Sequence, residues 1–160
     1  MAGGVWPMER INPRIQLNWG LQALVVGVLL GAAVFGGLFF SDRGQPSYAV
    51  VVFGLVFLVL LVHAHLRYRI WRFEVQDDAL FLHRGVLTRI RTVVPFVRVQ
   101  HVDTQRNPLE RMVGLSRVVV YTAGSRGADV TIPGLRPERA EALREQLRTL
   151  AGEHDPDDGV

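Results

Sequence analysis

The chain contains no cysteine and no lysine. Without cysteine it can form no disulfide, no cysteine-ligated zinc or iron–sulfur site and no thiol nucleophile. Its basic residues are therefore all arginines, and the 18 of them exceed the 15 acidic residues by only three charges. A net charge of +3 is too small to indicate a nucleic-acid partner, and we expect none.

Charge is also missing from two long stretches. No charged residue lies between Ile15 and Ser41, and a second uncharged run extends from Gly44 to Leu66. Twenty helical residues span about 30 Å, which is the thickness of the hydrocarbon core of a bilayer. The sequence therefore predicts a membrane protein with a transmembrane helical hairpin over residues 15–66, its helices at about 17–40 and 47–66.

The short loop Ser41–Ser47 allows only two adjacent antiparallel helices, so both ends of the hairpin are expected on one side of the membrane. Arginines flank these outer ends and outnumber the single arginine of the loop. The positive-inside rule then places residues 1–14 and the C-terminal part of the chain in the cytoplasm, at the plasma membrane. The flanking arginines are Arg10, Arg14, Arg67, Arg69 and Arg72.

Gly27 and Gly31 form a GxxxG pattern in the first apolar run. Small residues at this spacing let helix backbones approach closely. The partner is either the second helix of the same hairpin or the same helix of a second copy.

After Arg67 the apolar residues alternate with polar ones in short runs, which is typical of strands. Six strands at short spacing favour a small antiparallel barrel or sandwich. The run Val118–Ala123 is apolar on both faces and is expected to be a central strand. The other expected strands cover 71–76, Ala79–Arg84, Leu87–Val94, Val97–Thr104 and Ala128–Ile132, with a hairpin turn at Gly124–Gly127.

Two helices are expected in this part of the chain. Asn107 in a capping position, Pro108 at the first helical position and Gly114 just past the end predict one or two helical turns. Pro137–Ala151 has one apolar stripe and is expected to dock on the barrel as an amphipathic helix. Residues 152–160 are expected to form an acidic, disordered tail.

Four segments together resemble the bacterial and archaeal pleckstrin-homology-like (PH-like) domain, and with the preceding hairpin the chain resembles the YdbS-like family of PH domain-containing membrane proteins. The segments are Ala79–Leu87, Val94–Val102, Asn107–Leu115 and Val118–Gly124.

The resemblance implies a cytoplasmic PH-like domain over 67–151, often accompanied by a larger related protein, with no settled activity and no agreed catalytic residues. It implies structural roles for the motif residues Pro108, Arg111, Gly114 and Gly124. Asp77 and Asp78 occupy the hairpin that is basic in phosphoinositide-binding PH domains, which disfavours inositide recognition.

Few residues could carry chemistry. His101 and Asp103 are two apart on one expected strand and share a face, and His83 could join them in a metal-dependent enzyme if their strands met. The chain has no GxSxG, HExxH or GxxxxGK[ST] pattern. We therefore expect no catalytic residues, no metal and no cofactor.

The arginines are the better candidates. Arg67, Arg69 and Arg72 follow the second apolar run, where they either fix the topology or contact anionic headgroups. Arg89 and Arg91 share the polar face of the expected third strand and could contact the membrane or an acidic partner.

The sequence predicts a membrane-anchored PH-like scaffold or binding module without catalytic activity. Besides membrane lipids, its expected partner is another membrane protein, either a second PH-like membrane protein or a second copy of itself. The alternative is a protein that recognises anionic lipids or handles lipids.

Overall fold

The computed structural model describes residues 8–41, 45, 47–123 and 129–153, and it divides into two compact units. The sheet unit combines both ends of the chain, Met1–Ile15 and Ile70–Val160. The helical unit is the segment between them, Gln16–Arg69.

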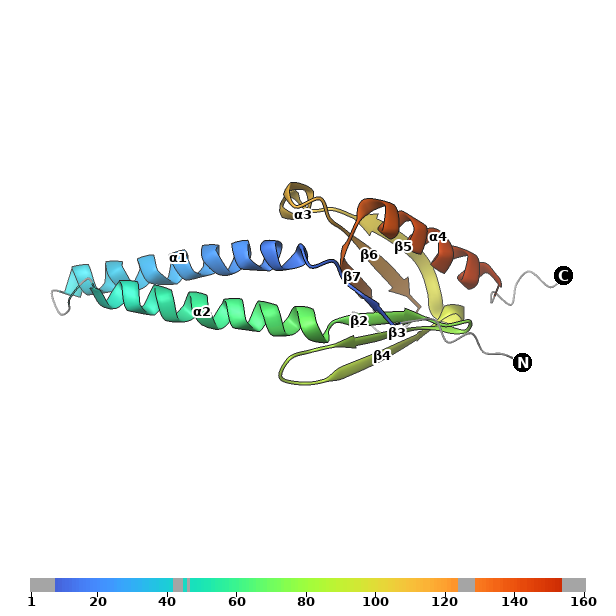
Figure 1. Ribbon diagram of the computed structural model, residues 1–160, viewed down its shortest axis with the longest axis horizontal. Coiled ribbons are helices and arrows are strands. Elements are labelled where there is room, and N and C mark those ends of the chain that lie inside the picture. Colours follow the sequence, from blue (N-terminus) through green and yellow to red (C-terminus); the bar gives the residue numbers. More distant parts are fainter. Residues whose placement is uncertain (1–7, 42–44, 46, 124–128, 154–160) are drawn as a thin grey trace. The chain divides into compact units, whose positions relative to one another are not determined.

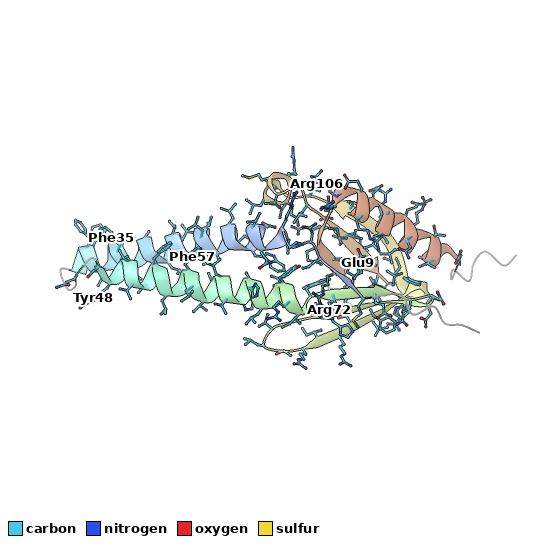
Figure 2. The ribbon with its side chains drawn as sticks, viewed as in Figure 1. Glu9, Phe35, Tyr48, Phe57, Arg72 and Arg106 are labelled. Carbon is cyan, nitrogen blue, oxygen red and sulfur yellow. The ribbon has the colours of Figure 1, made fainter. Side chains whose placement is uncertain are left out.

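The helical unit contains two long apolar helices, α1 (Ile15–Ser41) and α2 (Ser47–Ile70), which lie side by side (Figure 1). At about 1.5 Å per residue each is longer than the 30 Å or so of a hydrocarbon core. Only 11% of the most apolar part of each helix is buried, whereas a core helix of a soluble protein is mostly buried. Figure 2 shows apolar side chains such as Phe35 projecting from the helices. Length, composition and exposure therefore fit the predicted membrane spans.

Small residues of α1 allow the two helices to approach closely. Ala23, Gly27 and Gly31 are buried at successive turns of α1. A Cβ atom added at Gly31 would lie 3.2 Å from the Cβ of Phe53 on α2, and one at Gly27 would lie 3.3 Å from its ring. Phe53 therefore occupies the space that the two glycines leave open.

Helix α2 ends at Ile70, about one turn beyond the expected end near residue 66. Arg67 and Arg69 lie in its last turn, where cationic side chains interact favourably with the helix C-terminus. The predicted end follows from the end of the apolar run, but the helix continues for about one turn into the polar residues.

The sheet unit contains two antiparallel sheets with the orders β1-β2-β3-β4 and β5-β6-β7. The first sheet is formed by β1 (Glu9–Arg10), β2 (Arg72–Val75), β3 (Ala79–Arg84) and β4 (Ile90–Pro95). The second is formed by β5 (Val99–Gln105), β6 (Ser116–Thr122) and β7 (Val130–Leu135). The 3-10 turn Phe96–Arg98 leads from β4 to β5, α3 (Pro108–Met112) precedes β6, and α4 (Pro137–Glu153) follows β7.

The expected small antiparallel barrel is not closed, because no strand of one sheet pairs with a strand of the other in the described part of the chain. Antiparallel strands followed by a helix are confirmed, and the arrangement is consistent with a PH-like fold. Strand β1 was not predicted, since two residues are too few to show an alternating pattern.

Helix α4 packs against β5 and β6, as the apolar stripe predicts (Figure 1). Its Ala140, Leu143 and Leu147 are fully buried. The consecutive residues Val118–Val120 of β6 are also buried, so both faces of this strand are covered. Strand β6 is the central strand of its sheet, in agreement with the prediction.

Strand β4 begins at Ile90 instead of at the predicted Leu87, whose side chain is 95% exposed. A turn precedes it, in which Gly85 has a φ of +96° and the Thr88 carbonyl occupies the space that a Cβ would need. Val97 belongs to the 3-10 turn, so β5 starts two residues later than expected. The predicted turn Gly124–Gly127 and the tail beyond Glu153 lie outside the described residues.

The predicted signals around α3 form a capping box. The Asn107 side chain accepts a hydrogen bond from the Glu110 backbone N–H at 2.7 Å, and Glu110 Oε2 accepts one from the Asn107 N–H at 3.0 Å. Glu110 is 1% exposed, and Arg117 Nε donates to its carboxylate at 2.9 Å. This buried charge therefore has a partner of opposite sign.

Residues 9–14, which were expected only as part of a cytoplasmic N-terminal segment 1–14, belong to the sheet unit. Ile11 and Ile15 are each 1% exposed, and the Asn12 N–H donates to the Gly134 carbonyl at 2.7 Å. Arg139 of α4 donates from Nε to Glu9 Oε1 at 2.9 Å. Segments on both sides of the hairpin thus build one unit, and helices that span a bilayer leave both ends of the hairpin on the same side.

The hydrogen bonds to Glu9 raise the pKa of Arg139 above its usual value. A raised pKa in the folded state contributes stability that is fully present below the unfolded-state pKa and is lost only as the pH rises, in strongly alkaline solution, through the folded-state pKa. The charge on Arg139 therefore supports the N-terminal segment at every ordinary working pH.

We expect Gly134→Ala to destabilise the sheet unit by about 2 kcal/mol, because its φ is +69° and the new Cβ would lie 3.0 Å from Ile15 Cβ. Urea unfolding of the full-length protein in mild detergent, followed by tryptophan fluorescence, measures the change. Gly152→Ala is the control, since nothing lies within 4 Å of its added Cβ and alanine favours the helix. Equal effects would show that the N-terminal segment does not pack on Gly134.

In the helical unit, Gly31→Leu should lower the melting temperature in detergent, because the larger side chain collides with Phe53. Gly36→Leu is the matched control on the same helix, where nothing lies within 4 Å of the added Cβ. If both variants have the same melting temperature, the close approach of the helices at Gly31 does not stabilise the hairpin.

Candidate functional site

The first sheet aligns four basic side chains across its strands. Arg10 of β1 lies opposite Arg72 of β2, Arg72 lies opposite His83 of β3, and His83 lies opposite Arg91 of β4. Residues directly opposite one another on adjacent strands point to the same face of a sheet. We call these four residues the cationic row.

The row lies on the outer face of its sheet. Phe73 and Leu82, which alternate with Arg72 and His83 along β2 and β3, are buried in the core. Arg10 and Arg91 are exposed, and Arg72 (labelled in Figure 2) and His83 are half-buried. With strands about 4.8 Å apart, the row extends over about 14 Å.

Within the described residues, no member of the row has a carboxylate partner, whereas Arg117, Arg139, Arg144 and Arg148 each have one. Glu74 shares the face with Arg72, and its Oε1 accepts a hydrogen bond from Gln76. Like charges directly opposite on a sheet are destabilising. The like charges of Arg10 and Arg72, which lie directly opposite each other, therefore destabilise the unbound protein, and the three arginines of the row form a positive surface.

Apolar side chains lie beside the row on the same face. Phe81 and Val93 are opposite each other on β3 and β4, and Val93 is 51% exposed. Exposed Leu87 and Ile90 lie at the adjoining end of the β3–β4 hairpin. Charge next to accessible apolar area is typical of a surface that binds another protein.

The structure distributes the predicted arginines over both units. Arg72 and Arg91 belong to the cationic row, and Arg89 is exposed just before β4. Arg67 and Arg69 lie on α2 in the helical unit, where the Arg67 guanidinium lies 4.4 Å from the centre of the Trp19 ring.

The sequence predicts for Arg10 a role only in membrane topology and for His83 a role only in the metal hypothesis, and it does not predict that either lies on this surface. His83 alternates with Leu82 in a strand whose bounds were predicted correctly, so its outward direction could have been found. The position of Arg10 could not have been predicted in this way, because it depends on the pairing of β1 with β2, which lie on opposite sides of the helical hairpin in the sequence.

The three residues of the metal hypothesis lie on two different sheets. His101 and Asp103 are on β5 with 4.0 Å between Nε2 and Oδ2, and His83 is on β3. The His101 ring stacks on Tyr121 with 4.1 Å between the ring centres. The described ranges contain no group of three side chains that could hold a metal ion.

The motif residues lie around α3. Pro108 is its first residue, Arg111 is exposed, and the Arg111 carbonyl accepts a hydrogen bond from the Gly114 N–H at 3.3 Å. Gly114 has a φ of +70°, a conformation that favours glycine. Gly124 lies outside the described residues.

A family model described as "Bacterial PH domain" matches residues 21–151, which include most of α1, all of α2 and strands β2 to β7. The chain belongs to the bacterial PH domain family. Its match to the UPF0699 transmembrane protein YdbS of Bacillus subtilis (strain 168) is 30% identical and covers 94% of this chain and 97% of that protein. The YdbS-like resemblance is therefore confirmed, and this bacterial PH domain protein has two helices that are long and apolar enough to cross a membrane.

Two further similarities are weaker. The UPF0699 transmembrane protein YdbT of the same organism is 20% identical over 67% of this chain, and the match spans 22% of YdbT. A crystal structure of a DUF1696 family protein with a pleckstrin-homology domain from Shewanella loihica PV-4 superposes with a TM-score of 0.42 and 11% identity. The superposition covers 53% of this chain and 74% of that one.

The repulsion within the cationic row can be measured by a double-mutant cycle. We expect Arg10→Gln to raise the free energy of unfolding of this PH domain protein by about 0.5 kcal/mol at low salt, because it removes the like charge opposite Arg72. In an Arg72→Gln background the gain should vanish. It should also vanish at about 1 M salt, where the Debye length is about 3 Å. If Arg10→Gln raises the free energy of unfolding by the same amount in the Arg72→Gln background and at about 1 M salt, the charges of Arg10 and Arg72 do not interact.

Proposed function

We propose that this protein is a membrane-anchored PH-like binding module without catalytic activity, which joins a membrane protein complex through the outer face of its first sheet. The observation that carries the proposal is the cationic row, whose charges have no carboxylate partner within the described part of the chain. A bound acidic surface would remove the repulsion that the row imposes on the free protein.

The anchor supports a role in a complex. A binding domain held at the bilayer meets other membrane proteins at a raised effective concentration. We place both ends of the hairpin in the cytoplasm of the cell, at the plasma membrane, because the arginines flank the outer ends of α1 and α2.

The partner in this proposal is another membrane protein that presents an acidic surface with apolar residues beside it. A second PH-like membrane protein and a second copy of this chain are the two forms that we propose to test first. Complementary charge sets the orientation and the association rate, while Phe81 and Val93 offer apolar area to the contact.

The test is extraction of the complex from native membranes in mild detergent, followed by its mass in solution. The wild-type protein should elute with a mass above that of the monomer, together with a stoichiometric protein partner or a second copy. Arg72→Glu/Arg91→Glu should lose the partner, because it reverses two charges of the row. Arg98→Glu/Arg136→Glu is the control, since it reverses two exposed charges outside the row.

A wild-type protein that elutes as a monomer without a partner would contradict the proposal. Loss of the partner to the same extent in the row variant and in the control variant would also contradict it. The lipid alternative is tested in parallel with full-length protein in vesicles of neutral or anionic lipid. If anionic lipid alone binds the row, and Arg72→Glu/Arg91→Glu abolishes that binding, the protein is a lipid-recognising module instead.

A further inference from the structure

A groove of about 480 Å³ lies between the edge of the second sheet and helix α4. One wall is the run Val99–Val102 of β5, and the other is formed by residues of the last turns of α4. Because β5 belongs to the second sheet, this groove is separate from the cationic row. The residues from α4 are Arg144, Arg148, Ala151 and Gly152.

The β5 wall offers backbone hydrogen-bonding groups. Strand β5 pairs with β6 on one side only, so its other side is a free edge in the described structure. The pairing is interrupted between Val99 and His101, which leaves Gln100 outside the ladder. In such a bulge the extra residue is unpaired, and its N–H and C=O are available to a bound segment.

The α4 wall offers two guanidinium groups one helical turn apart. Arg144 and Arg148 are separated by a rise of about 6 Å along α4. In an extended chain, side chains on one face recur every two residues, which is about 6.7 Å. Two carboxylates at alternate positions of an extended segment therefore match the spacing of the two arginines.

Both arginines have ion-pair partners on α4 itself, and the pair of Arg148 is the weaker of the two. Arg144 and Arg148 pair with Glu141 and Glu145 three residues earlier on the same helix. Arg148 is 78% exposed and its pair is 3.8 Å long, and exposed pairs of this kind contribute little to stability. A carboxylate of a segment whose backbone is hydrogen-bonded to β5 can replace Glu145 as the partner of Arg148 and share Arg144 with Glu141.

We infer that this groove binds an extended acidic segment of a partner protein, which lies along the edge of β5 and places alternate carboxylates on Arg144 and Arg148. Main-chain hydrogen bonds to a sheet edge give such binding its affinity, and side-chain contacts give its specificity. The inference deepens the proposed function, since it names the chemistry that a protein partner would present at a second surface.

The probe is a fluorescent peptide, Asp-Thr-Asp-Val-Asp-Thr, titrated into full-length protein in mild detergent and followed by anisotropy at low salt. It should bind about tenfold more tightly than the same peptide with Asn at each Asp, because charge-assisted hydrogen bonds are lost. Hydrogen exchange should slow at the backbone of Gln100–Thr104 when it binds.

Arg144→Gln/Arg148→Gln should weaken peptide binding about tenfold or more. Arg98→Gln/Arg136→Gln is the matched control and should leave it unchanged. Arg72→Glu/Arg91→Glu should also leave it unchanged, so loss of the partner in the complex and loss of the peptide are separate results.

Three results would overturn the inference: equal affinity for the Asp and Asn peptides, equal losses in the groove and control variants, or unchanged hydrogen exchange along β5. A fourth concerns the acidic end of this chain. If Asp155→Asn/Asp157→Asn/Asp158→Asn raises the affinity for the peptide about tenfold, the groove is occupied by the chain's own C-terminal residues and not by a partner.

Discussion

The sheet unit depends on the attachment of the residues from Glu9 to Ile15, the last of which begins the first helix. Burial of Ile11 and Ile15, the Asn12–Gly134 backbone hydrogen bond and the Glu9–Arg139 ion pair hold this segment in place. Its two-residue strand adds β1 to the first sheet and sets Arg10 opposite Arg72. It also makes the sheet unit discontinuous in sequence, with the helical hairpin inserted between Ile15 and Ile70.

Charged side chains in the core and on the surface of the sheet unit have different surroundings. Glu110 is fully buried and is matched by Arg117, because an unpaired charge in that position would be very costly. The charges of the cationic row lie on the surface, where water reduces but does not remove their repulsion. The buried charge is paired within the domain, whereas the like charges on the surface are not. This difference fits a domain whose core is complete and whose outer face is complementary to an acidic partner.

Much of the fold could be predicted because its signals are local. The uncharged runs predicted both helices, Asn107 and Pro108 predicted α3, and the spacing of Ala140, Leu143 and Leu147 predicted the docking of α4. The rest depends on contacts between distant segments. Strand β1, the open arrangement of the two sheets and the alignment of Arg10 with Arg72 follow from pairing across the hairpin, which no local pattern contains.

The discontinuous sheet unit has a consequence for the order of events during synthesis. Glu9 and Arg10 leave the ribosome before either helix, but their partners on β2 and α4 follow only after both helices. Strand β1 therefore cannot pair until β2 has been synthesised. Pairing between segments so far apart in the sequence is slow compared with local folding. Both helices are therefore synthesised before the first sheet can be completed, so a finished sheet unit marks a chain whose hairpin has already left the ribosome.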